Sequence, residues 1–190
     1  IRYSINAGYF TDFNAIVSSV DGDKVSLDRT LFYPLGGGQN WDTGTLEGPN
    51  GRLHVHEVRG RGNIFHTIDS DHQLEIGDEV KGAIDWQRRH AHMRMHTAQH
   101  LVSGIVYEAF NGARTVGNQI HDDRFRIAFN PIYFHEGMLE YLTQQVTVLI
   151  NQENKLETVS YTHRPQPTNT KNQAQQHELQ HNTTLHSHLF

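Results

Sequence analysis

Short runs in which apolar and polar residues alternate dominate residues 1–85. The runs are rich in β-branched and aromatic side chains, and segments such as DGD, GGG and GPNG separate them. Alternation with a period of two between such breaks is typical of β-strands that bury one face. The runs that carry this pattern are NAIVSSV, KVSL, RLHVHEV and NIFHTI. We therefore expect residues 1–85 to form a small β-rich domain.

The hydrophobic pattern changes at residue 86. Apolar residues recur at positions 91, 95, 98, 101, 102, 105 and 109, which is the period of an amphipathic helix. Asp85 is a candidate N-cap, and Asn111-Gly112 is a candidate stop. Further on, RFRIAFN predicts a strand and HEGMLEYLTQQVTVLINQEN predicts a second helix. The expected fold class is α+β, with a second domain over residues 86–162.

The last part of the chain, residues 163–190, has a different composition. Asn, Gln and His make up 13 of these 28 residues, and only five are apolar. So few apolar side chains bury too little surface to offset the entropy of ordering the chain. We expect this polar tail to be disordered or atypical and to add little to a core.

The composition limits the metal ligands, the partners and the location that the chain can have. The 190 residues are 36% hydrophobic, which is enough for a buried core, and they include no cysteine, so a metal would have to be held by His, Asp or Glu. A net charge of −5 argues against coating nucleic acid by bulk electrostatics. With no apolar run long enough to cross a bilayer and no signal peptide, we expect a cytoplasmic protein. The chain begins at Ile1, which leaves open whether an N-terminal segment is missing.

Two histidines, His96 and His100, lie four residues apart in the first predicted helix. Side chains at this spacing share one helix face, where two imidazole nitrogens can reach a single zinc ion at about 2.0–2.1 Å. The alternative is a pair of solvated histidines, since the chain contains 15 His. The helical period predicts that the pair avoids the core, because it shares a stripe with Ser103 and Tyr107 roughly opposite Ala98, Val102, Ile105 and Ala109.

Three other motifs have both a functional and an ordinary explanation. The segment LGGGQ lacks the Gly-Lys-Ser/Thr ending of a phosphate-binding loop, so ATP binding is not expected, and by itself it indicates a flexible turn. Asn118 and Gln119 follow Gly117 as in an ordinary polar turn. The most basic stretch could contact nucleic-acid phosphate or form a solvated helix face; it contains Arg88, Arg89, His90, His92 and Arg94.

Taken together, three segments resemble a known family in order and spacing. DRTLFYPLGGGQNWDTG, AIDWQRRHAHMRMHTAQHL and GARTVGNQIHDDRFRIAFN are similar to the editing domain of alanyl-tRNA synthetase and to the free-standing AlaX trans-editing proteins, over residues 10 to about 155. The resemblance implies a β-barrel-like N-terminal domain with a Gly-rich loop, followed by an α/β editing domain. It also implies hydrolysis of tRNA(Ala) mischarged with serine or glycine, with no obligate protein partner evident.

The resemblance also implies site residues. His96 and His100 correspond to the first half of a zinc site, and zinc would position the substrate and either polarise the ester carbonyl or activate water. Gln99, at a position where the family can have threonine, could hydrogen-bond the amino acid. The loop expected to close on the aminoacylated tRNA end comprises Gly36, Gly37, Gly38 and Gln39, and the polar residues expected to face the substrate are Asn118 and Gln119.

The chain departs from the family where the zinc site should be completed. The Cys-x-x-x-His segment of the family is missing, and HELQH offers only His177 and His181 in its place. We favour an incomplete site over this substitute, which leaves a tRNA-acceptor-binding module without hydrolysis as an alternative function. HELQH also matches a metalloprotease motif with Glu178 as general base, although the surrounding segment has almost no apolar face. Zinc content and turnover would separate these possibilities.

Overall fold

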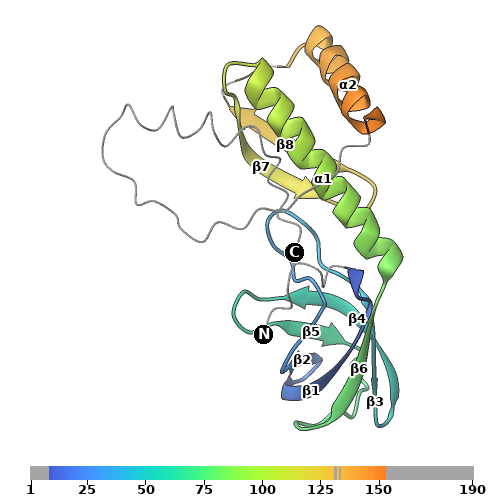
Figure 1. Ribbon diagram of the computed structural model, residues 1–190. Coiled ribbons are helices and arrows are strands. Elements are labelled where there is room, and N and C mark those ends of the chain that lie inside the picture. Colours follow the sequence, from blue (N-terminus) through green and yellow to red (C-terminus); the bar gives the residue numbers. More distant parts are fainter. Residues whose placement is uncertain (1–8, 131, 133, 153–190) are drawn as a thin grey trace, which may run out of the picture. The chain divides into compact units, whose positions relative to one another are not determined.

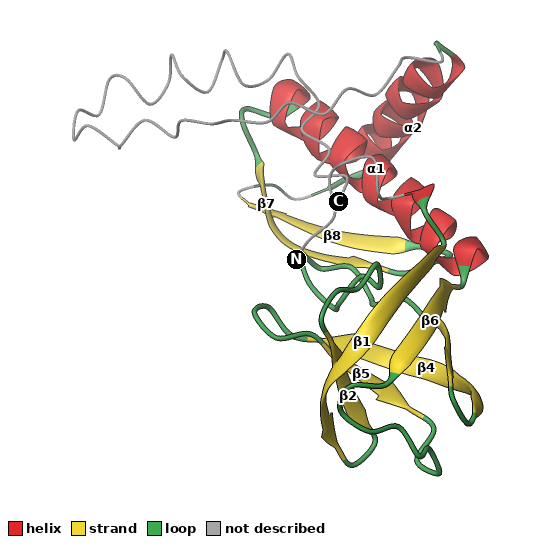
Figure 2. Ribbon diagram, turned by 60° about the horizontal axis from the view of Figure 1, so that its bottom comes forward, coloured by secondary structure: helices red, strands yellow, loops and turns green. Residues whose placement is uncertain are grey.

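A computed structural model describes residues 9–130, 132 and 134–152 of this chain, and it confirms the expected α+β class (Figures 1 and 2). Eight strands and two helices follow one another along this described part of the chain. They are β1 (Asp12–Asp21), β2 (Lys24–Leu27), β3 (Gly44–Gly48), β4 (Gly51–Arg59), β5 (Phe65–Ile68), β6 (Glu79–Ile84), α1 (Trp86–Ala109), β7 (Arg114–Ile120), β8 (Phe125–Asn130) and α2 (Glu136–Asn151).

The first six strands close into an antiparallel barrel in the order β1-β2-β5-β4-β3-β6. The barrel-like domain implied by the resemblance is therefore confirmed, and the four runs expected to be strands are β1, β2, β4 and β5. The sequence pattern missed β3 and β6, which contain glycine. At Gly82 in β6 a Cβ atom would lie 2.3 Å from the ring of Phe13, so glycine is required there by close packing.

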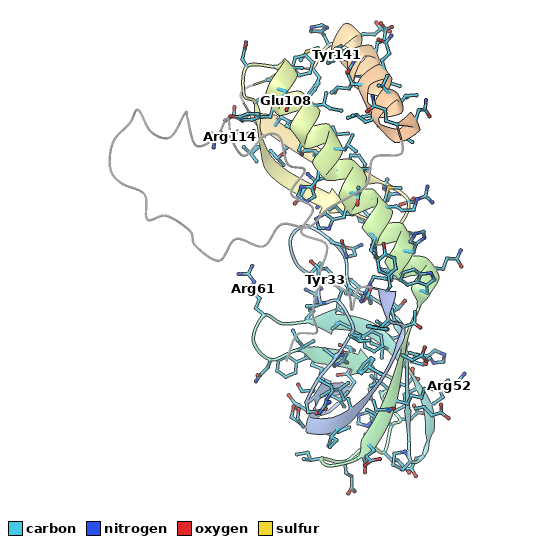
Figure 3. All side chains as sticks on the ribbon, in the orientation of Figure 1. Tyr33, Arg52, Arg61, Glu108, Arg114 and Tyr141 are labelled. Carbon is cyan, nitrogen blue, oxygen red and sulfur yellow. The ribbon has the colours of Figure 1, made fainter. Side chains whose placement is uncertain are left out.

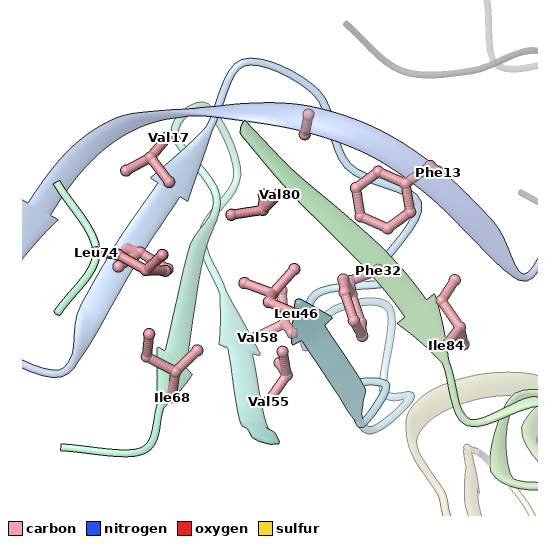
Figure 4. Packing of buried hydrophobic residues seen from close by; sticks show 12 residues of the cluster. Phe13, Val17, Phe32, Leu46, Val55, Val58, Ile68, Leu74, Val80 and Ile84 are labelled. Carbon is pink, nitrogen blue, oxygen red and sulfur yellow. The ribbon is translucent and has the colours of Figure 1, made fainter. Parts of the chain in front are cut away.

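The barrel interior is filled by alternate residues of its strands. In β1 the side chains of Phe13, Ala15 and Val17 point inward while those between them are exposed, as the period-two pattern predicts. Leu46 from β3 and Phe32 from the segment before it complete the centre of this core (Figure 4). The two aromatic rings of Phe13 and Phe32 meet edge to face with centroids 5.8 Å apart.

Helix α1 begins and ends where the sequence predicts. The carboxylate of Asp85 accepts a hydrogen bond from the backbone N–H of Arg88 at 3.1 Å, which is the N-cap interaction. After the last helical residue, Asn111 and Gly112 have φ angles of 52° and 73°, the left-handed conformation that ends a helix. Both expected end signals are therefore confirmed.

Within the described residues the chain divides into two compact units. The first contains residues 9–96 and 118–126, and the second contains residues 97–117 and the described part of 127–152. The second unit has its own small core, formed by Val106, Ala113 and Leu142. The division places one boundary inside α1, whereas the domain limits 1–85, 86–162 and 163–190 stay predictions, and the polar tail lies outside the described residues. Neither described helix is apolar over a length that could cross a membrane.

Candidate active site

The Gly-rich segment forms a tight turn that is closed by hydrogen bonds. Gly36 and Gln39 exchange backbone hydrogen bonds of 3.2 and 2.9 Å, and the residues between them, Gly37 and Gly38, have φ angles of 60° and 82°. These positive φ angles favour glycine at both positions. The hydroxyl of Tyr33, labelled in Figure 3, donates to the carbonyl oxygen of Gly36 at 2.8 Å. The segment is thus a defined turn in this structure; its contact with tRNA stays a prediction.

Residues of strand β7 form hydrogen bonds with this turn. The amide Nδ2 of Asn118 donates to the carbonyl oxygen of Gly37 at 3.2 Å, and Ile120 donates its backbone N–H to the carbonyl of Gly38 at 2.8 Å. A Cβ atom on Gly38 would lie 2.1 Å from Oδ1 of Asn118, so no other residue fits there without movement. The interpretation of Asn118 and Gln119 as a polar turn is wrong, because both lie within β7, where Gln119 is exposed.

His96 is buried, contrary to the expectation that its helix face avoids the core. Its side chain is 6% exposed, and its Nδ1 atom lies 2.7 Å from Oε1 of Gln39, which is itself completely buried. Because an amide oxygen only accepts hydrogen bonds, Nδ1 of His96 is the donor in this contact. The solvated alternative is therefore wrong for His96. The helical period could not reveal the burial, since it describes one helix and not the turn packed against it.

The other two residues expected on this helix face are enclosed to different degrees. Gln99 is buried and donates through Nε2 to the hydroxyl of Ser103 at 2.8 Å, and Ser103 shares a 2.8 Å hydrogen bond with Thr115. His100 lies one helical turn after His96 and is half-buried. The amide of Gln99 is therefore already engaged by Ser103, and its contact with an amino acid stays a prediction.

The basic stretch of α1 is not a single solvated face. Arg89 is buried and forms an ion pair with the buried Asp42, whose carboxylate also accepts the backbone N–H of Tyr33 at 2.6 Å. His92 is completely buried as well; burial and then the charge of Arg88 lower its pKa, so it is neutral at pH 7. The pairing of Arg89 with Asp42 could not be predicted from the sequence, because nothing in the local pattern joins residues 47 positions apart.

Two candidate zinc ligands lie among the described residues. Nδ1 of His96 is engaged by the amide of Gln39, and His100 follows at the spacing that places a second imidazole on the same helix face. Within residues 9–152, no three His, Asp or Glu side chains are grouped closely enough to hold a metal ion. The candidate ligands His177 and His181, together with Glu178, lie outside the described residues.

Sequence comparison finds relatives in the same family that the three motifs resemble. A family model described as tRNA synthetases class II (A) matches residues 5–88. The alanyl-tRNA editing protein AlaX-M of Methanosarcina barkeri is 43% identical over 141 residues, covering 70% of this chain and 58% of that protein. AlaX-M of Saccharolobus solfataricus is 42% identical over 125 residues, covering 64% of this chain and 52% of that protein.

A longer relative matches over a similar stretch. The alanine–tRNA ligase of Thermococcus kodakarensis is 37% identical over 121 residues, covering 63% of this chain and 13% of the ligase. The expected resemblance to alanyl-tRNA synthetase and AlaX sequences is confirmed by these matches. This chain spans about half the length of the AlaX-M relatives that it matches.

Proposed function

Because this chain is related to the alanyl-tRNA editing proteins AlaX-M and to the alanine–tRNA ligases, we propose that it is an aminoacyl-tRNA deacylase acting on tRNA(Ala) mischarged with serine or glycine. In the reaction, water adds to the ester carbonyl carbon, and the bond between that carbon and the ribose oxygen breaks to release the amino acid and tRNA. The proposed substrate implies the cytoplasm as the location.

The contact between His96 and Gln39 is the observation that carries the proposal. It fixes the ring of a buried imidazole one turn before His100 on the same helix. We propose these two histidines as zinc ligands. When bound, zinc supplies Lewis acidity toward an ester carbonyl and toward water at near-neutral pH. A buried and pre-oriented imidazole binds a metal without first losing rotamer freedom, which favours a specific site over a solvated pair.

The substrate-binding role is proposed for residues around the same part of α1. Gly36, Gly37 and Gly38 form the turn that would meet the aminoacylated tRNA end, and their backbone can approach a ligand closely because it carries no side chains. Asn118 and Gln119 on β7 offer amide groups next to that turn. Gln99 would pair with a polar group of the amino acid. A site that hydrogen-bonds the serine hydroxyl disfavours alanine, because alanine would leave the buried partner unpaired.

Ester hydrolysis on defined tRNAs tests the proposal. The 190-residue chain is mixed with tRNA(Ala) carrying serine, glycine or alanine, and the loss of aminoacyl ester is followed with time. We expect faster loss of serine or glycine than of alanine, and loss of that activity in His96→Gln and His100→Gln. The control is His90→Gln, which changes an exposed histidine of the same helix that stacks on Trp86. Background loss of all three esters would contradict the proposal.

One observation favours a second candidate function. The described residues supply no third His, Asp or Glu close enough to complete a metal site, and the whole chain has no cysteine. A module that binds the tRNA acceptor end without hydrolysis would fit such an incomplete site. It would retain mischarged tRNA(Ala) on a filter and show no turnover at saturating zinc. The metalloprotease alternative rests on HELQH, which lies outside the described residues.

A further inference from the structure

Two Asn-Gly dipeptides occur in the chain, Asn50-Gly51 and Asn111-Gly112. Asparagine followed by glycine is prone to spontaneous deamidation, because glycine has no side chain that hinders its backbone nitrogen or restricts its backbone. That nitrogen attacks the side-chain carbonyl carbon of asparagine, and ammonia leaves. Water then opens the resulting succinimide to aspartate or isoaspartate. Since the two dipeptides have the same intrinsic chemistry, local structure decides which of them reacts.

The first dipeptide, Asn50-Gly51, lies at the tip of the hairpin that joins β3 and β4. Gly48 and Gly51 form the last residue pair of this hairpin, and Pro49 and Asn50 make the turn between them. Both residues of the dipeptide are exposed, and a Cβ atom on Gly51 would meet no atom of the described residues within 4 Å apart from its chain neighbours. The amide of Asn50 donates a long hydrogen bond of 3.5 Å to the carbonyl oxygen of Gln73. The side chain of Asn50 therefore has space to turn toward the backbone nitrogen of Gly51.

The second dipeptide, Asn111-Gly112, is held by backbone hydrogen bonds at the end of α1. The backbone N–H of Gly112 donates to the carbonyl oxygen of Tyr107 at 2.9 Å, and that of Ala113 donates to the carbonyl oxygen of Phe110 at 3.1 Å. The nitrogen that would attack Asn111 is thus engaged in a hydrogen bond. Ala113, the next residue, is buried in the core of the second unit. Attack therefore requires that the last turn of α1 opens and that a buried residue moves.

The free energy of local opening separates the two dipeptides. Exposed chain ends and turns open at little cost, whereas a segment that is packed in a core opens at a cost that approaches the free energy of global unfolding. The turn at Asn50 lies where the β3–β4 ladder ends. Asn111 belongs to a capped helix end beside a buried residue. The same chemical step therefore carries a much larger opening cost at Asn111.

We propose that Asn50 is a site of spontaneous deamidation in this protein and that the capped end of α1 protects Asn111 from the same reaction. Deamidation converts an uncharged amide into a carboxylate, so the net charge of −5 becomes one unit more negative. Asn50 lines a pocket together with Glu75 and Asp78, so the new carboxylate joins two others there. The inference is independent of the proposed function, because neither asparagine belongs to the proposed site.

Peptide mass spectrometry compares the two sites within one sample of the full chain. The folded protein is kept at mildly alkaline pH, where a backbone nitrogen is more readily deprotonated, and samples taken with time are digested. We expect the peptide with Asn50 to be converted at least about tenfold faster than the peptide with Asn111, because of their different opening costs. Equal rates, faster conversion of Asn111 or an unmodified Asn50 would overturn the inference.

The same chain unfolded in urea is the matched control. Unfolding removes both the hairpin turn and the helix cap, so the two dipeptides should then react at similar rates. A preference for Asn50 as large in urea as in the folded protein would show that the flanking sequence causes the difference. That result would contradict the protection assigned to the end of α1.

A pair of variants tests the site through its charge. Glutamine closes a larger and less favoured ring, so Asn50→Gln should remove most of the acidic form that accumulates in the original chain, as measured by anion-exchange chromatography. Asn63→Gln changes an exposed asparagine that precedes isoleucine and should leave this accumulation unchanged. Unchanged accumulation in Asn50→Gln, or an equal fall in both variants, would overturn the inference.

Discussion

The barrel interior and the polar side chains around the start of α1 are buried to the same degree but are built differently. The barrel interior is almost entirely apolar, and its one completely buried histidine, His66, has both ring nitrogens engaged, by Thr30 and by the carbonyl of Val25. We define the polar cluster as five buried polar side chains, two from the segment before β3 and three from residues 86–96 of α1. They are Gln39, Asp42, Arg89, His92 and His96.

More buried polar atoms lack a hydrogen-bond partner in the polar cluster than in the barrel. Among the described residues these are Gln39 Nε2 and both ring nitrogens of His92 in the cluster, and Ser26 Oγ of strand β2 in the barrel. Each buried polar atom left in this way costs about 1–3 kcal/mol, whereas the barrel core gains about 25 cal/mol for each Å² of apolar surface removed from water. The comparison indicates that the barrel core stabilises the fold and that the unpaired atoms of the polar cluster reduce this stability.

Breaking the ion pair of the polar cluster should have the largest effect. Asp42→Ala leaves the buried guanidinium of Arg89 without its carboxylate, and removing one partner of a buried pair typically costs about 3–5 kcal/mol. We expect a loss of this size in the free energy of unfolding, measured by urea denaturation. Asp71→Ala, at an exposed position, is the control and should change stability by less than about 0.5 kcal/mol. Similar stability of the two variants would contradict the importance of the pair.

A cavity in the barrel should cause the second-largest loss in the free energy of unfolding. Leu46→Ala removes a completely buried side chain from the barrel centre and should cost about 2–5 kcal/mol, because the apolar contacts are lost and the site collapses only in part. Ile16→Ala, on the outer face of β1, should cost much less. If Leu46→Ala lowers the free energy of unfolding and leaves zinc affinity unchanged, the barrel and the polar cluster have separate roles. A fall in both quantities would contradict this separation.

Acid should destabilise the barrel through His66. Burial lowers the pKa of this histidine to about 4, although its hydrogen bond to Val25 partly opposes the shift. The unfolded chain therefore takes up a proton near pH 6.5, before the folded chain does. The stabilisation is complete above about pH 6.5 and is lost as the pH falls toward 4, by about 3 kcal/mol in total.

His66→Gln should reduce this acid sensitivity. The measurement is urea denaturation at pH 7 and at pH 4.5, with the difference between the two free energies compared in the original chain and in the variant. If the two chains lose the same stability between these pH values, His66 does not carry the acid sensitivity.

Replacing a residue of the polar cluster with an apolar one should change the free energy of unfolding the least, and it should raise it. His92→Leu replaces a buried imidazole that has no hydrogen-bond partner among the described residues, so stability should rise by about 1 kcal/mol. A calorimetric melt beside the original chain measures this change. A clear loss of stability would indicate that His92 is satisfied in solution and that the contrast with His66 is smaller than the structure indicates.

Local patterns predicted a good part of this fold. The N-cap at Asp85, the stop at Asn111-Gly112 and the strands β1, β2, β4 and β5 all follow from interactions between residues close together in the chain. The strands β3 and β6 and the strand β7 were missed, because glycine and polar residues weaken the local signal while neighbouring strands supply the hydrogen bonds. Pairing between distant segments overrides a weak intrinsic preference for strand.

For the candidate site, the sequence by itself determined the spacing of His96 and His100 along one helix and the relation to alanyl-tRNA editing proteins. Only the tertiary structure decided which face of α1 is buried, because burial depends on what packs against a helix and not on the helix alone. The same holds for Gln39: a turn 57 residues earlier places an amide oxygen against His96, and no local pattern encodes a contact between segments so far apart.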